Sequence, residues 1–350
     1  MIRIKIISTL LLMGAGQLAY SQQVAIQIFK PDTSTSIRAI AVPNDSTVWF
    51  GGSKGKYGFT IDNDNSWTVI QKGNDLRNAE FRSIAALPSG AVFMTNIGSP
   101  GYILQLSDDG FNWQQRYKNE AKDQFFDALV FVSDEVGYAL GDPLSGCIQL
   151  LKTNDAGKNW NPINCNDLPA LDSGEAFFAS SNTSMDALGK HIWIATGGPK
   201  ARVVYSGDNG ASWKLFKTPI QQGSKMTGIF SLDMYNEKIG VVAGGDYDNK
   251  AETKNTIAFT KDGGRTWKVK ANQLPFVSCV QFIPGSKGKK LLAACLPGVY
   301  YSNNAGLTWL KISDESFYTL RITPSGKIAW FAGAKGLIGK MNLTDIGANN

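Results

Sequence analysis

The chain has 350 residues, a formal net charge of +6 and a single histidine. This length is enough for one large repeat domain or for two ordinary domains. The densest basic group, Lys287, Lys289 and Lys290, lies in a glycine-rich stretch. A nucleic-acid-binding protein usually carries a basic stripe with aromatic residues set into it. The composition therefore argues against nucleic acid as a partner.

The first residues have the features of a secretory signal peptide. Arg3 and Lys5 precede an apolar run at 6–13, and small residues lead to Ser21. This order predicts a signal peptide over residues 1–21, and a mature chain that is periplasmic or secreted. The apolar run is too short to span a membrane, and no later stretch is suited to do so. The alternative, a buried first strand, would have to place both basic residues in the core.

One short motif returns along the chain with the form S/T-x-D-x-G-x-T/S-W. It is best preserved at 153–160, 206–213 and 260–267, and three degraded copies end at Trp67, Trp113 and Trp309. Copies recur about every fifty residues, which is the signature of a repeat architecture. The Asp (or Asn) and the Trp of the six copies are Asp62 and Trp67, Asp108 and Trp113, Asp155 and Trp160, Asp208 and Trp213, Asp262 and Trp267, and Asn304 and Trp309.

The chemistry of the motif fits a turn between two antiparallel strands. Its carboxylate can accept backbone N–H groups within the turn, and its glycine supplies a positive φ. The Trp ring then packs against the next repeat, as large aromatic rings commonly do between layers. We therefore interpret these carboxylates as structural and not as catalytic acids.

Each motif follows three stretches with the alternation of β-strands, and one more strand follows it. The second strands share an aromatic position, occupied by Trp49, Tyr138, Trp193 and Trp330. Three strands, a turn and a fourth strand describe one blade of a β-propeller. The sequence predicts blade boundaries near 36, 80, 124, 173, 226, 276 and 317.

The last unit, from residue 317 onward, contains three strands and no motif. An unpaired strand edge would leave it open to aggregation. A spare strand is present at the other end of the mature chain, at residues 24–29. The sequence therefore predicts an all-β protein with a single seven-bladed propeller over 22–350, whose ring is closed by pairing of 24–29 with 337–341.

The pattern of a G-Y-A-x-G strand followed by the turn motif, seen best from Gly137 to Trp160, resembles one family closely. It is similar to the Asp-box (BNR-type) propellers related to the photosystem II assembly and stability factor and to their exported bacterial relatives. The resemblance covers essentially the whole mature chain. It implies a non-enzymatic assembly, scaffold or ligand-binding role, although fold alone does not decide function.

Motifs for catalysis or cofactor binding are incomplete. Arg82 follows Phe81 as in a sialidase arginine motif, but the expected Ile-Pro is missing, and the G-x-S-x-G and G-x-G-x-x-G motifs are also missing. With His191 alone and no Cys-x-x-Cys, a transition-metal site is not expected. Residues 246–249 resemble a calcium loop only weakly, since acidic hairpin tips are usually solvated. We expect neither cofactor nor metal.

One set of positions is a candidate binding site. The first strand of every blade lines the central channel, and one position can be followed around the ring. It reads Arg38, Arg82, Asp127, Glu175, Phe230, Ser278 and Tyr318. Four charges in neighbouring blades indicate a polar site at the channel mouth. The alternative is that these charges pair with each other in water.

The four cysteines permit two disulfides in an exported protein. Cys147 and Cys165 lie at similar distances from the centre of one turn motif, and Cys279 and Cys295 flank the loop near residue 287. Cross-strand neighbours lie about 4.5–5.5 Å apart, within disulfide reach. A register slip of one residue would break either pair and leave buried free thiols.

Two functional classes stay open from the sequence. The leading one is a monomeric, non-enzymatic binding or assembly propeller whose ligand is an unidentified protein or carbohydrate. The alternative is a carbohydrate-active glycoside hydrolase, which would need two close carboxylates in a cleft. Asp127 and Glu175 are the candidates for such a pair.

Overall fold

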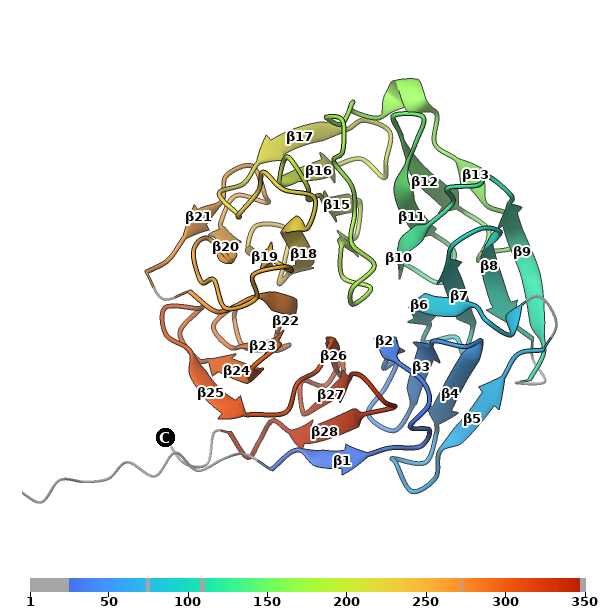
Figure 1. Ribbon diagram of the computed structural model, residues 1–350, viewed down its shortest axis with the longest axis horizontal. Coiled ribbons are helices and arrows are strands. Elements are labelled where there is room, and N and C mark those ends of the chain that lie inside the picture. Colours follow the sequence, from blue (N-terminus) through green and yellow to red (C-terminus); the bar gives the residue numbers. More distant parts are fainter. Residues whose placement is uncertain (1–24, 74–75, 108–110, 272, 347–350) are drawn as a thin grey trace, which may run out of the picture.

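The computed structural model describes residues 25–73, 76–107, 111–271 and 273–346. Seven four-stranded antiparallel sheets are arranged around one central axis (Figure 1). This is the all-β, seven-bladed propeller that the repeat predicts. The predicted signal peptide at 1–21 and Asp108 lie outside the described residues.

We number the blades one to seven by their inner strands. The inner strands are β2 (Ile37–Ala41), β6 (Glu80–Ala86), β10 (Phe126–Phe131), β14 (Met185–Leu188), β18 (Thr227–Met234), β22 (Val277–Phe282) and β26 (Thr319–Ile322). The second strands are β3 (Val48–Gly52), β7 (Val92–Ile97), β11 (Gly137–Leu144), β15 (His191–Ala195), β19 (Gly240–Asp246), β23 (Leu291–Cys295) and β27 (Ile328–Ala332).

The third strands are β4 (Lys56–Thr60), β8 (Gly101–Leu106), β12 (Cys147–Thr153), β16 (Arg202–Ser206), β20 (Ile257–Thr260), β24 (Gly298–Ser302) and β28 (Ile338–Asn342). The outer strands are β5 (Thr68–Gln71), β9 (Trp113–Asn119), β13 (Asn161–Pro162), β17 (Lys214–Lys217), β21 (Lys268–Val269), β25 (Leu310–Ser313) and β1 (Gln27–Phe29).

The ring closes as the sequence predicts, because the N-terminal strand β1 is the outer strand of blade seven. Gln27 pairs with Lys340 and Phe29 with Ile338, in antiparallel register. The Phe29 ring also packs between two tryptophans, with its centroid 5.9 Å from Trp67 and 6.0 Å from Trp330. Residues from the two ends of the chain therefore share one sheet and one core.

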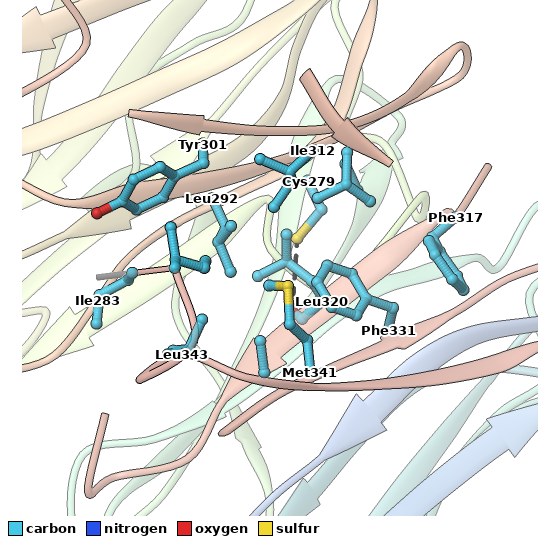
Figure 2. Close-up of a cluster of buried hydrophobic side chains, with 14 residues drawn as sticks. Cys279, Ile283, Leu292, Tyr301, Ile312, Phe317, Leu320, Phe331, Met341 and Leu343 are labelled. Atoms are coloured by element: carbon cyan, nitrogen blue, oxygen red, sulfur yellow. Dashed lines mark hydrogen bonds between the residues drawn. The ribbon is translucent and has the colours of Figure 1, made fainter. Parts of the chain in front are cut away.

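The hydrophobic core is divided into slices between neighbouring blades. In the slice between blades six and seven, Leu292 of β23 meets Leu320, Phe331 and Met341 of blade seven (Figure 2). These four side chains are at most 1% exposed. Because each blade packs on both faces, its inner strands read as nearly continuous apolar runs, whereas outer strands such as β13 and β21 are exposed.

The motif turns carry a constant set of hydrogen bonds. In blade four, the Ser206 hydroxyl donates to Asp208 Oδ1 over 2.8 Å and accepts the Gly210 N–H over 2.8 Å. Asp208 Oδ1 in turn accepts the Ser212 N–H over 2.9 Å. Asn304 replaces the aspartate in blade six and still accepts a backbone N–H at the same position. The side chains of the motif thus accept the backbone N–H groups that the turn leaves without backbone partners.

Each turn docks on an aromatic side chain of the preceding blade. Gly157 has a φ of 75°, and a Cβ there would lie 2.4 Å from the Phe93 ring of blade two. The Trp193 indole donates to the Gly263 carbonyl of the next blade over 2.9 Å. Trp160 likewise contacts Phe93, with ring centroids 6.4 Å apart. The motif tryptophan therefore packs on the preceding repeat, and the sequence expectation of the next repeat is wrong.

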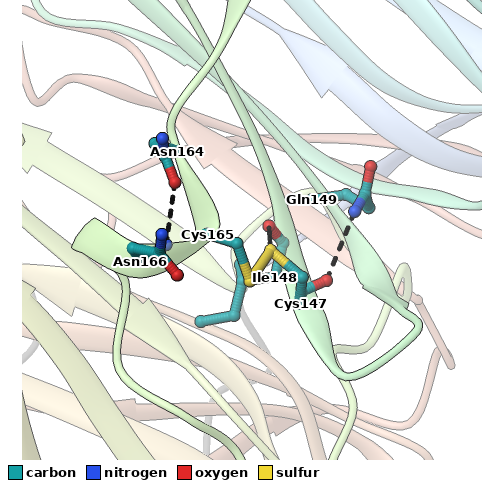
Figure 3. Close-up of a disulfide and its surroundings, with 6 residues drawn as sticks. All are labelled: Cys147, Ile148, Gln149, Asn164, Cys165 and Asn166. Atoms are coloured by element: carbon teal, nitrogen blue, oxygen red, sulfur yellow. Dashed lines mark hydrogen bonds between the residues drawn. A yellow bond between two sulfur atoms is a disulfide. The ribbon is translucent and has the colours of Figure 1, made fainter.

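A disulfide joins Cys147 and Cys165, whose Cα atoms lie 5.6 Å apart (Figure 3). Cys165 begins a short 3₁₀ helix, Cys165–Asp167, in which the Asn164 side chain accepts the Asn166 N–H. The bond ties β12 to the segment that leaves blade three.

The second candidate pair does not form, since Cys279 and Cys295 are buried free thiols. The hairpin pairs Phe282 with Leu291, and this register continues to Cys279, which pairs with Ala294, whereas Cys295 pairs with Val277 beyond the bulge at Ser278. Cys279 consequently packs toward blade seven and Cys295 toward blade five. Because Ala294 and Cys295 are consecutive on β23, the two thiols lie on opposite faces of the sheet.

Phe29 provides a test of the ring closure. Phe29→Ala should lower the free energy of unfolding by about 2–3 kcal/mol, because it empties the space between two tryptophans. Ile28→Ala is the matched control on the same strand, where the side chain is 38% exposed, and it should change stability by less than about 0.5 kcal/mol. Equilibrium urea unfolding measures both, and equal losses would contradict the closure as a source of stability.

The turn carboxylates predict a dependence of stability on acid. Hydrogen bonds from Ser212 and Ser206 lower the pKa of Asp208 to about 2. The folded state therefore holds this group ionised, and the stability it contributes above about pH 4 is lost as pH falls toward 2. Asp208→Asn should flatten the fall of the melting temperature over that range, since Asn304 already performs the same bonds uncharged. Parallel melting curves for the two proteins from pH 5 to 2 would refute this.

Candidate functional site

The predicted channel position lies at a β-bulge in five inner strands. The register of each strand shifts at one residue, and that residue is the one predicted from the sequence: Arg38, Arg82, Asp127, Phe230 and Ser278. Bulges re-aim a side chain and raise the local twist. In blade seven, Tyr318 directly precedes β26. We call this end of the channel the upper mouth.

Blade four does not contribute Glu175 to this position, so this part of the sequence prediction is wrong. Its inner strand begins only at Met185, well after the boundary predicted near 173. The Glu175 carboxylate is buried beside Arg202, with which it forms an ion pair, and it accepts the Thr196 hydroxyl over 2.6 Å. A long connection from β13 displaces the strand and uses Glu175 to anchor itself.

This connection enters the channel and closes it. Residues 176–184, which we call the plug, run from the rim toward the axis of the ring (Figure 1). Ser180, Ser181, Asn182, Thr183 and Ser184 are all at most 8% exposed. Such a polar segment is stable in the interior only if its groups find partners.

The plug is hydrogen-bonded to all six other blades. Asn182 donates to the Ile84 carbonyl of blade two over 3.0 Å and accepts the Leu129 N–H of blade three over 2.9 Å. The remaining contacts are Arg38 to Ser180 O in blade one, Thr183 to Ser231 in blade five, Ser181 to Ser278 O in blade six, and Arg321 to Ser181 O in blade seven. One segment thus links the whole ring.

Two glycines let the plug approach the neighbouring blades. Gly197 forms bridges with Ala176 on one side and Gly228 on the other. A Cβ on Gly228 would lie 2.3 Å from the Gly197 Cα, so neither position has room for a side chain. Blades four and five are joined through backbone at this point.

Above the plug, the upper mouth is a pocket of about 410 Å³. Its walls include Arg38, Arg82, Phe178, Phe230 and Tyr247. The Phe178 and Phe230 rings are stacked, with centroids 3.8 Å apart and planes within 2°. Volume and lining are those of a small-ligand site, which is mostly apolar with few polar groups.

The two arginines of the upper mouth differ in whether they have a carboxylate partner. Glu80 accepts hydrogen bonds from Arg82 Nε and Nη2, over 3.1 and 2.6 Å. The Arg38 guanidinium instead lies 3.9 Å above the Tyr318 ring. Burial, with the Arg82 guanidinium nearby, lowers the pKa of Arg38. Arg38 is therefore held in an environment that disfavours its charge.

The carboxyls beside the pocket are also desolvated. Asp127 is fully buried, and no residue in the described part of the chain forms a hydrogen bond with either of its carboxyl oxygens. Burial, and next the Asp142 carboxyl, raise the pKa of Asp127 well above its usual range. Burial likewise raises the pKa of Asp142, which lines the pocket and accepts the Phe177 N–H.

Ser278 and Tyr318 support the site without reaching into it as free groups. The Ser278 hydroxyl donates to the Tyr318 carbonyl over 2.6 Å, which ties blade six to blade seven. The Tyr318 ring forms a cation–π contact with the Arg38 guanidinium. These two residues were predicted as ligand contacts, and neither is among the residues that line the pocket.

The opposite end of the channel, the lower mouth, holds a second pocket of about 260 Å³. Its acidic side chains bind the next blade: Asp186 accepts the Met234 N–H, and Asp233 accepts the Phe282 N–H, each over 2.7 Å. Burial and the neighbouring Asp186 raise the pKa of Asp233 to about 8. We interpret these carboxyls as links between blades.

Sequence reasoning missed several residues of the upper mouth. Phe178 belongs to the plug, which no repeat pattern announces. Tyr247 lies in the acidic loop considered only for calcium, where Asp246 accepts the Asp248 N–H in a local turn. In the described part of the chain, no cluster of three potential metal ligands is present. The described residues also include no helix with the length and hydropathy of a membrane span.

Seven four-stranded blades around a channel define the protein as a seven-bladed β-propeller. Its sequence matches the DUF6242 beta propeller domain over residues 21–332, and the chain belongs to this family. No significant match is found among curated proteins.

Solved structures share this fold over almost the whole chain. YCF48 bound to D1 peptide aligns with a TM-score of 0.62 and 14% identity, over 91% of this chain and 96% of that one. YCF48 from Cyanidioschyzon merolae aligns at 0.63 and 14%, over 92% and 98%. The WD40 repeats of RRP9 align at 0.64 and 13%, over 92% and 99%. Identities this low establish a common fold and no more.

The plug can be tested at Asn182, whose φ is 57°. Asn182→Ala should cost about 2–4 kcal/mol of stability, because it leaves two buried backbone groups unpaired and strains the backbone. Asn182→Gly should cost about 1 kcal/mol less, since glycine adopts this φ freely.

Asn209→Ala is the matched control for this test. Asn209 is exposed and has a φ of 58°, so it reports the strain alone, which is about 1 kcal/mol. Urea unfolding that gives the same loss at both sites would show that the plug contacts contribute nothing.

Proposed function

We propose that this protein is an exported, non-enzymatic binding or assembly propeller that holds its ligand at the upper mouth. The observation that carries the proposal is a concave pocket whose central cation, Arg38, has no carboxylate partner among the described residues. The plug forms the floor of this pocket, so a ligand approaches from one face and does not pass through the ring.

The fold neighbours support a binding role. YCF48 has been solved with a D1 peptide, so the architecture accommodates a peptide partner in at least one protein. Propellers of this kind present a rigid mouth formed by the inner strands. For this chain the partner's identity is part of the proposal and does not follow from the fold.

The carboxylates favour binding over hydrolysis. A glycoside hydrolase needs two carboxyl groups that reach the sugar from opposite sides. Asp127 is fully buried, and Glu175 is paired with Arg202, so neither of the two predicted candidates faces the pocket. Asp142 alone contributes a carboxyl among the described residues that line it.

Export has support from the cysteine chemistry. The Cys147–Cys165 disulfide suits an oxidising compartment, where such bonds form and persist. The N-terminal Arg3 and Lys5 with the apolar run that follows them support the same proposal.

A double variant tests the proposed function. Arg38→Ala with Arg82→Ala should remove most binding to any partner captured from the native exported fraction, while costing at most about 1–2 kcal/mol of stability, since their plug contacts are long at 3.4 Å. Arg116→Ala on the outer strand β9 is the control. A partner retained by the double variant would contradict the proposal, and so would glycosidase turnover by the purified protein.

A further inference from the structure

Arg38 is a largely desolvated cation without a countercharge. Its Nη1 donates to the Ser180 carbonyl over 3.4 Å, and no carboxylate within the described residues forms an ion pair with it. A desolvated charge without a partner destabilises a folded protein. An anion bound in the pocket would supply the missing charge.

The geometry of Arg38 suits an anionic group of a ligand. The contact with the Tyr318 ring and the bond to the Ser180 carbonyl restrict the movement of the guanidinium. A fixed guanidinium edge can offer two parallel donors to a carboxylate or phosphate. Arg82 differs, because Glu80 already accepts two of its donors. Arg38 is therefore the anchor, and Arg82 contributes its charge at a distance.

Nearby acids do not cancel this positive charge. Burial raises the pKa values of both Asp142 and Asp127, which favours their neutral forms. Lys225 also lines the pocket. Among the described residues that line the pocket, three cations, Arg38, Arg82 and Lys225, therefore stand against one carboxyl, Asp142.

The walls of the pocket fit an apolar body next to the anion. Phe178 and Phe230 form one stacked face, and the Tyr247 ring lies 6.3 Å from Phe230, centroid to centroid. Phe125 and Met226 also belong to the apolar lining. With about 410 Å³ available, the pocket has room for a body of one or two rings beside Arg38.

We propose that the upper mouth binds an organic anion, with a carboxylate or similar oxyanion held by Arg38 and an apolar, ring-sized body packed on Phe178 and Phe230. This inference rests on the proposed binding function and names the chemistry of the ligand. A free small acid and the C-terminal carboxylate of a partner that ends in an aromatic residue share this chemistry.

Fluorine NMR tests the proposal with two matched pairs of probes. The first pair is 4-fluorophenylacetate and its neutral amide. The second is a pentapeptide ending in 4-fluorophenylalanine, with a free or an amidated C-terminus. Each acid should bind at least about tenfold more tightly than its amide, because a charge-assisted contact to Arg38 is lost in the amide. Tighter binding of the peptide acid than of the small acid identifies a chain end as the source.

Single substitutions test whether Arg38 causes the preference for the acids over the amides. Arg38→Gln should weaken both acids at least about tenfold and leave the amides unchanged. Arg82→Gln should weaken the acids by only about threefold, as expected for a charge acting at a distance. Arg116→Gln, on β9, should bind as the wild type does.

Three results would overturn the inference: no binding of either acid at 10 mM, at which a site of even about 10 mM affinity would be half filled; equal affinity for acid and amide; or unchanged binding by Arg38→Gln. Those results would leave the proposed function standing if a captured partner still depends on the two arginines. Glycosidase turnover would instead contradict the proposed function, and the binding of the fluorinated acids and amides would still decide whether the anion site exists.

Discussion

The ring depends on the polar contacts between the plug and the inner strands. Seven inner strands meet at an axis, and each is the edge of its sheet, so that some of its backbone groups have no sheet partner. Unpaired buried groups are costly. Asn182 satisfies one carbonyl and one N–H from two different blades. On the opposite side of the ring, the Ser181 hydroxyl donates to the Ser278 carbonyl, and the Thr183 carbonyl accepts the Leu232 N–H. A short run of small polar residues therefore replaces the water that would otherwise fill the channel.

The same segment creates the binding site. By closing the channel, the plug turns an open passage into two separate pockets, one at each mouth. It also brings Phe178 onto Phe230 and offers the Ser180 carbonyl to Arg38. The long connection from β13 thus delays the start of the inner strand of blade four to Met185 and provides the floor and one wall of the upper mouth.

The two mouths differ in how their charged groups are used. At the lower mouth, Asp186 and Asp233 each accept a backbone N–H from the next blade, which makes them part of the frame. At the upper mouth, Arg38 rests on an aromatic ring and lacks a carboxylate partner within the described residues. Charged groups that bond to a neighbouring blade stabilise the ring, whereas a charged group without a countercharge is available for a ligand.

The sequence by itself determined the blade number, the structural role of the turn motifs and the closure by the N-terminal strand. Those features repeat along the chain or follow from an unpaired edge, so local patterns are enough to find them. The bulge residues could also be aligned in five blades, because the inner strands keep one register. Only the tertiary structure decided the place of Glu175, the separation of Cys279 from Cys295, and the plug. The place of Glu175 and the plug depend on one long connection, and the separation of the two thiols depends on the register of one hairpin. Periodicity carries no information about such single events.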